Sequence, residues 1–205
     1  MKSYKKNFEL LKKNHVYSEE MEHDACGVGL IASTEGKKSR KVVEYGIEAL
    51  KAVWHRGAVD ADGKTGDGAG IHVEIPKDFF IEKIEVTGHS YDNSEICVGM
   101  IFLPRNDYAA QESCKTIVES ELTKNNFSIY GWRQVPVNPK VLGEKAFQTM
   151  PEIIQVLFKS NNPELLNKDL ERKIYETRRI IENKAFQISL NNFYICSLSS
   201  KSIIY

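Results

Sequence analysis

The residues from Ile96 to Leu103 form a continuous apolar run, Ile-Cys-Val-Gly-Met-Ile-Phe-Leu, that ends at Pro104. A short apolar run without polar interruption predicts a strand that is buried on both faces. Other elements must then cover both faces of the sheet that contains this strand. The chain is therefore expected to fold in layers, with this strand near the centre.

The rest of the chain supplies elements for such layers. Further strands are predicted at 28–33, 71–75, 127–135, 152–158, 193–198 and 203–205. Helices are predicted at 39–54 with Ser39 as N-cap, after Asp107 to about 125, and from Asn162-Pro163 to about 181. A short helix or turn is expected to start at 76–80, and a loop or short helical turn is expected at 141–149. This order is typical of sheets covered by helices, and 205 residues with 41% hydrophobic content suffice for one domain.

Charge and composition exclude several classes of partner. Lys plus Arg and Asp plus Glu both number 28, so no global field draws nucleic acid or an anionic membrane. No segment approaches the roughly 18 apolar residues of a membrane span, and the lysine-rich start lacks the apolar middle of a secretory signal. We expect a cytoplasmic protein whose partner is a small molecule or another protein.

The four cysteines do not form a metal-binding pattern. Cys26, Cys97, Cys114 and Cys196 lie far apart, with no Cys-x-x-Cys pair and no histidine at zinc-finger spacing. A zinc site or an iron–sulfur cluster within this chain is therefore not expected. Cys114 falls on the predicted inward face of its helix and is expected to be inert.

One cysteine stands out by its surroundings. Cys26 lies between a charged segment and the predicted strand that starts at Val28, and it is followed by Gly27 and Gly29. A thiol at the mouth of a strand, beside glycines that allow close approach, suits a nucleophile. The alternative is a small buried hydrophobic residue, which is the usual role of a free cysteine.

The segment 54–71 is too rich in glycine and aspartate for a core and is expected to form a shaped loop. A phosphate-binding P-loop would need glycine where Ala58 stands, and a helix after Thr65. A calcium-binding EF-hand starting at Asp60 would need glutamate where Ile71 stands. Both readings are disfavoured by this spacing.

Several separated motifs, in this order, resemble one family. They are Cys26-Gly27-Val28-Gly29, His55-Arg56-Gly57-Ala58, Thr65-Gly66-Asp67-Gly68-Ala69-Gly70, Trp132 to Asn138, Pro151 to Gln155, Glu171 to Arg179 and Phe193 to Ser200. Together they resemble the class II glutamine amidotransferase domain of the glutamate synthase large subunit, which is an N-terminal-nucleophile hydrolase. The resemblance covers essentially Tyr17 to Tyr205.

This resemblance implies a fold and a division of the chain. The fold is α+β, a four-layer α/β/β/α sandwich of the N-terminal-nucleophile hydrolase type, which is expected to be incomplete at the C-terminus. Residues 1–25 are expected to be a propeptide or leader, and residues 26–205 the N-terminal part of the amidotransferase domain.

The resemblance also implies site residues. Cys26 would be the catalytic nucleophile, and Arg56 would lie beside it as a second catalytic residue, with Gly57 allowing the close approach of substrate. No residue is expected to bind a cofactor or a metal. Trp132 and Arg133 suit the binding of a carboxylate, but a half-buried strand with an exposed arginine is an equally good interpretation.

Two motifs of the family, Ser-Arg-Phe-Ser-Thr-Asn and His-Asn-Gly-Glu, do not occur in these residues. The chain alone is therefore expected to be inactive as a glutaminase. The synthase region that would use the ammonia, with its flavin mononucleotide and iron–sulfur cluster, is expected in the same or another chain. The alternative function is a truncated, non-catalytic interaction or regulatory fragment of this domain.

Overall fold

The computed structural model describes residues 6, 9–10, 13, 27–53 and 59–205. At its centre lies a four-stranded antiparallel sheet in the order β3-β4-β2-β5. Its strands are β2 (Cys97–Leu103), β3 (Phe127–Gln134), β4 (Glu152–Ser160) and β5 (Tyr194–Ser199). The apolar run at 96–103 thus forms an inner strand, as the sequence predicts.

The side chains of β2 alternate between two hydrophobic clusters, one on each face of the sheet. Cys97, Ile101 and Leu103 belong to the first cluster, whereas Val98 and Met100 belong to the second. This alternation is the period of two that a pleated strand imposes. Both faces of the sheet are therefore covered.

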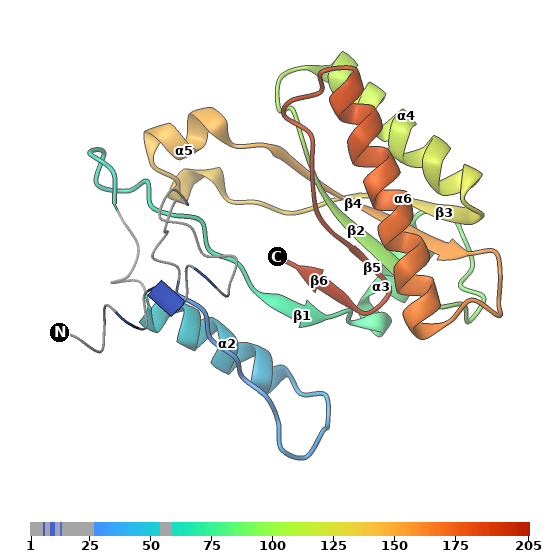
Figure 1. Ribbon diagram of the computed structural model, residues 1–205, viewed down its shortest axis with the longest axis horizontal. Helices are drawn as coiled ribbons and strands as arrows, with labels where there is room; N and C mark the ends of the chain where they lie inside the picture. Colours follow the sequence, from blue (N-terminus) through green and yellow to red (C-terminus); the bar gives the residue numbers. More distant parts are fainter. Residues whose placement is uncertain (1–5, 7–8, 11–12, 14–26, 54–58) are drawn as a thin grey trace.

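The first face is covered by α4 (Tyr108–Lys124) and α6 (Asn167–Gln187), which lie side by side in Figure 1. Asp107 caps α4 as predicted, because its carboxylate accepts a hydrogen bond from the Ala110 amide at 2.9 Å. Glu121 of α4 is almost fully buried and forms ion pairs with Lys124 at 3.0 Å and Lys184 of α6 at 2.6 Å. The contact with Lys184 joins the two helices.

The second face is covered by a smaller layer. β1 (His72–Glu74) pairs antiparallel with β6 (Ser202–Ile204), and α3 (Lys77–Val86) packs Phe80 and Ile84 into the same cluster as Ile203. α2 (Arg40–Ala52) lies beyond β1 and β6, away from α4 and α6 (Figure 1). The remaining elements are the 3-10 helix η2 (Pro139–Val141) and α5 (Glu144–Thr149).

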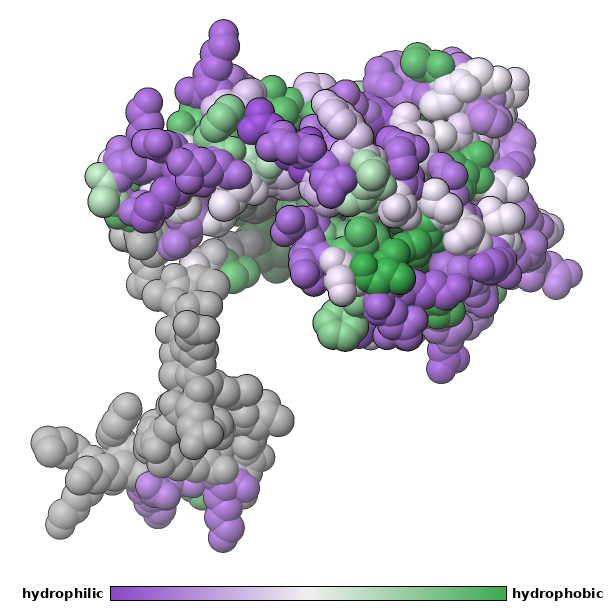
Figure 2. All heavy atoms as spheres, turned by 90° about the horizontal axis from the view of Figure 1, so that it is seen from above, coloured by the Kyte–Doolittle hydropathy of each residue, from purple (hydrophilic) through white to green (hydrophobic). Residues whose placement is uncertain are grey.

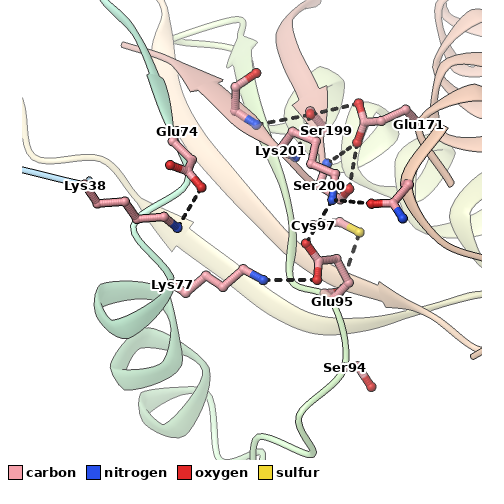
Figure 3. Close-up of polar contacts among 12 residues, drawn as sticks. Lys38, Glu74, Lys77, Ser94, Glu95, Cys97, Glu171, Ser199, Ser200 and Lys201 are labelled. Carbon is pink, nitrogen blue, oxygen red and sulfur yellow. Dashed lines mark hydrogen bonds and ion pairs between the residues drawn. The ribbon is translucent and has the colours of Figure 1, made fainter. Parts of the chain in front are cut away.

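Polar contacts join the turn after β5 to its neighbours (Figure 3). The carboxylate of Glu171, on α6, accepts hydrogen bonds from the Ser200 amide at 2.7 Å and from the Ser199 hydroxyl at 2.9 Å. Burial alone would raise the pKa of Glu95, but Lys77 and Lys201 outweigh it and hold this pKa below its ordinary value. The turn that leads from the large sheet to β6 is thus held by Glu171 of α6 and, through Lys201, by Glu95.

This arrangement confirms the predicted α+β class with antiparallel sheets. One predicted boundary is wrong. The last long helix begins at Asn167 and not at Asn162, because the Asn162 side chain accepts a hydrogen bond from the Glu164 amide and forms a turn there. Leu166 is consequently 53% exposed and does not face the core. Of the two alternatives for 76–80, the structure has the helix, α3, which continues to Val86.

The predicted strand at 28–33 is also wrong, because the structure assigns no strand to these residues. Val28 and Leu30 are 94% and 89% exposed, so they are far from being core residues. A strand needs a partner for its backbone groups, and β1 and β6 pair with each other.

Figure 2 shows the surface from above, with hydrophobic side chains gathered in places between hydrophilic ones.

Candidate functional site

The predicted site residues Cys26, Arg56 and Gly57 lie outside the described residues, so the structure does not test their roles. The segments that adjoin them are described, however. Cys26 is followed by the exposed segment 27–33, and residues 54–58 connect α2 to a loop that begins at Val59. These neighbouring segments are the described surroundings of the predicted site.

The helix α2 leads directly to the segment with Arg56. Its N-cap is Ser39, as predicted, and the Ser39 hydroxyl accepts a hydrogen bond from the Lys41 amide at 3.2 Å. Its apolar positions, among them Val43, Ile47 and Leu50, are half-buried on one side of the helix. The helix ends at Ala52, with Val53 as C-cap, so a regular element ends shortly before Arg56.

The loop after Arg56 is held by its own hydrogen bonds. The Asp60 amide donates to the Thr65 carbonyl at 2.7 Å, and Val59 forms a β-bridge with Gly66. Asp62 accepts from the amides of Lys64 and Thr65 at 2.9 and 2.7 Å and from the Thr65 hydroxyl at 2.5 Å. The Thr65 and Lys64 hydrogen bonds lower the pKa of Asp62 well below its ordinary value. This aspartate shapes the loop, as expected for this segment.

A contact with α5 fixes the loop to the rest of the fold. The Lys145 ammonium lies 2.8 and 2.7 Å from the two carboxylate oxygens of Asp60, and the Ala146 amide donates to the Thr65 hydroxyl at 3.3 Å. Gly143 precedes α5 at the same place. The sequence gives no signal for this contact, because these residues are about 80 positions apart and no periodicity links them. Sequence reasoning missed Lys145 for that reason.

No helix follows the Gly63-Lys64-Thr65 turn until α3. A P-loop needs a helix directly after the threonine, whose amides face the phosphate. Within residues 59–76, the structure thus agrees with the exclusion of a P-loop by spacing.

The cysteines that the structure describes are poor nucleophiles. Cys97 and Cys114 are fully buried, and burial raises the pKa of Cys97 far above its ordinary value and that of Cys114 to about 11. Burial also raises the pKa of the half-buried Cys196. Because the thiolate is the reactive form, none of these three is activated.

Trp132 and Arg133, the candidate carboxylate-binding pair, lie on opposite faces of β3. The Trp132 indole packs toward α4 and donates to Glu119 at 2.6 Å. Arg133 follows on the opposite face of β3 and donates from Nη1 to the Gln155 amide oxygen at 2.8 Å. Neither side chain therefore assists the other.

A sequence model of the family described as "Glutamine amidotransferases class-II" matches residues 26–205. The chain belongs to the class II glutamine amidotransferases. The family confirms the resemblance read from the motifs, and its match begins at Cys26. The division between residues 1–25 and 26–205 stays a prediction.

Named relatives of this amidotransferase are glutamate synthases. It is 52% identical over 202 residues to the "Glutamate synthase [NADPH] large chain" of Azospirillum brasilense, covering 98% of this chain and 13% of that protein. It is 40% identical over 204 residues to the "Ferredoxin-dependent glutamate synthase" of Pyropia yezoensis, covering 96% and 13%. It is 37% identical over 203 residues to the chloroplastic "Ferredoxin-dependent glutamate synthase 2" of Arabidopsis thaliana, covering 97% and 12%. The chain thus spans 12–13% of the length of these relatives.

Among the residues that the structure describes, no cluster of three or more His, Cys, Asp or Glu side chains could hold a metal ion. No helix in that part of the chain has the length and hydrophobicity to cross a membrane.

We predict that Gly143→Ala destabilises the amidotransferase by about 1–3 kcal/mol, as is typical of overpacking. A Cβ atom at Gly143 would overlap the Thr65 amide nitrogen and lie 2.5 Å from Asp62 Oδ2, so the loop would have to move away from α5. The free energy of unfolding in urea measures the effect. Gly68→Ala is the matched control, since a Cβ there meets no atom within 4 Å. Equal stability of the two variants would show that the loop does not pack on α5.

Proposed function

We propose that this chain supplies the glutaminase part of a glutamate synthase. In this role it hydrolyses glutamine to glutamate and ammonia, and the ammonia serves the reductive synthesis of glutamate from 2-oxoglutarate. The observation that carries the proposal is the family match that begins at Cys26. The names of the relatives support the assignment to glutamate synthase.

Cys26 is the proposed nucleophile. Its sulfur attacks the side-chain carbonyl carbon of glutamine, the C–N bond breaks, and the amide nitrogen leaves as ammonia after it takes up a proton. Water then hydrolyses the thioester and releases glutamate, so that one glutamine and one water give one glutamate and one ammonia. The raised pKa values of the other three cysteines support this choice, because those thiols are not activated.

The proposed base is the α-amino group of Cys26 itself. Such a group has a pKa of about 7.7–8.0, so at neutral pH it can accept the thiol proton directly or through a water. An amide-bonded nitrogen cannot do this. Removal of residues 1–25 as a leader is therefore part of the proposal, and the uncleaved protein should be inactive.

Arg56 is proposed to lie beside the nucleophile, where its positive charge favours the thiolate and orients the substrate. Gly57 is proposed to allow the substrate to approach the backbone. Support comes from their neighbours, because α2 ends shortly before Arg56 and the Asp60–Lys145 contact anchors the chain shortly after Gly57.

The wider context is also proposed. A synthase region in the same or another chain would receive the ammonia and would hold flavin mononucleotide and an iron–sulfur cluster, and no residue of this chain is proposed to bind either group. The protein is proposed to act in the cytoplasm. The competing proposal, a non-catalytic fragment of the domain, predicts a stable protein that never releases ammonia.

The test is ammonia release from L-glutamine by the polypeptide made from the longest natural reading frame. We expect release that saturates with L-glutamine, and release from L-asparagine at least about tenfold slower because its shorter side chain misplaces the amide. Equal release from both amides, or none from a protein that starts at Cys26, would contradict the proposed glutaminase.

A further inference from the structure

Gln155 occupies an unusual place for a polar side chain. It lies on β4, paired with Met100 of β2 and Arg133 of β3, and it is fully buried. Its neighbours along the strand alternate between the two hydrophobic clusters, so Gln155 shares the second face with Ile153 and Leu157. A residue of similar size without polar atoms, such as methionine, would be expected at this position.

The amide of Gln155 is only half satisfied. Its oxygen accepts a hydrogen bond from Arg133 Nη1 at 2.8 Å, but its nitrogen Nε2 is buried and has no hydrogen-bond partner among the described residues. Rotation of the amide by 180° would not help, because a guanidinium has donors only. A buried donor without an acceptor costs free energy, so the chain retains Gln155 at the expense of stability. Such sites are commonly functional.

Arg133 is the partner that Gln155 holds. Its guanidinium lies 5.1 Å from the centre of the Phe79 ring, on the second face of the sheet, and the side chain is half-buried. Stacking on Phe79 and the bond to Gln155 leave further N–H donors of the fork without an acceptor in the described part of the chain.

The other arginines provide a comparison. Those that lie within 4.0 Å of a glutamate are Arg40, Arg172, Arg178 and Arg179. Arg105 has no such partner among the described residues, but it donates to the Phe147 backbone carbonyl. Arg133 has no acidic side chain of the described residues at that distance, although it is oriented from two sides. An oriented guanidinium with free donors matches a carboxylate, whose two oxygens accept two parallel hydrogen bonds.

We propose that Arg133, positioned by Gln155 and Phe79, binds the carboxylate group of a small-molecule ligand. Arg133 contacts the ligand, whereas Gln155 acts through Arg133. The site is made of described residues only and does not depend on the chemistry proposed for Cys26. Because L-glutamate is also the proposed product of the glutaminase, the Arg133 variants, and not the rise in melting temperature alone, separate this site from the glutaminase.

The test uses the full chain with Cys26→Ala, so that no turnover affects the binding. Its melting temperature is measured with increasing L-glutamate, against sodium chloride of equal ionic strength. We expect a saturable rise, since a ligand that binds only the folded state stabilises it. Arg133→Met should weaken the apparent affinity at least about tenfold, because both donors of the fork are lost. The matched control Arg172→Met, at an exposed arginine of α6, should bind as the parent does.

Two further variants separate binding from stability. Gln155→Met should raise the melting temperature of the free protein, because the buried donor is removed, and should weaken L-glutamate binding severalfold, because Arg133 loses its orientation. A purely structural Gln155 would lower the melting temperature instead. If Arg133→Met does not fold, Arg133→Lys decides, since it keeps the charge and loses the fork. The absence of a saturable rise in the parent, or an equal rise in the folded Arg133 variant, would overturn the proposal.

Discussion

Replacing Cys26 by alanine is expected to abolish glutamine hydrolysis, to block removal of residues 1–25 and to prevent labelling by a glutamine-mimicking electrophile. All three effects follow from the loss of one sulfur, which is the proposed nucleophile in each reaction. Loss of a nucleophile can lower a turnover rate by up to about a millionfold, so we expect at least about a thousandfold decrease in ammonia release. Intact mass spectrometry and an ammonia assay measure these effects.

The control for this variant is Cys196→Ala. Cys196 is half-buried and its pKa is raised by burial, so it is expected to be the least hindered of the unactivated thiols. Its replacement should leave labelling, processing and ammonia release unchanged. Undiminished labelling of the Cys26→Ala protein would refute the assignment of Cys26 as the nucleophile.

Replacing Arg56 by alanine is expected to lower kcat/KM for glutamine by about a hundred- to a thousandfold, which is typical of removing one preorganised charged or hydrogen-bonding group from an active site. The fold should be retained, since α2 ends before this residue and the loop after it is anchored by Asp60 and Lys145. Steady-state kinetics of the natural full-length polypeptide, with circular dichroism as a check of folding, measure the effect.

Arg40→Ala is the matched control, because Arg40 starts the same helix, is exposed and contacts only Glu44 among the acidic residues described. Its loss should change kcat/KM less than about twofold, since exposed ion pairs contribute little. If Arg56→Ala hydrolyses glutamine as well as Arg40→Ala does, then Arg56 has no part in the site.

The sequence predicts most of the sheet and its outer helices, because these elements carry strong periodic signals. The apolar run at 96–103 becomes β2, and the helix capped by Asp107 becomes α4 with Cys114, Val118 and Leu122 buried. Local hydrogen bonding explains the failure at Asn162, whose side chain forms a turn where a helix was predicted. The exposed segment 27–33 shows a different limit, since apolar residues predict a strand but cannot specify its partner.

The candidate site is predicted from motifs, and motifs identify residues near the reaction better than the residues that support them. Cys26 and Arg56 are predicted in this way and stay predictions, whereas the family match agrees with the motifs. Lys145 was missed because its contact with Asp60 joins segments that are distant in sequence. The sequence does not predict the Gln155–Arg133 hydrogen bond for the same reason, although it indicates Trp132 and Arg133 as a candidate carboxylate-binding pair. Only the register of β3 and β4 brings the two side chains together.

The most direct test of the central claim is the intact mass of the natural full-length protein after treatment with a glutamine-mimicking electrophile, followed by mapping of the modified peptide. We expect a protein that begins at Cys26 and carries one adduct on the sulfur of that residue. A processed protein with the adduct on Cys97, Cys114 or Cys196, or with no adduct at all, would contradict the proposal that Cys26 is the nucleophile of a glutaminase.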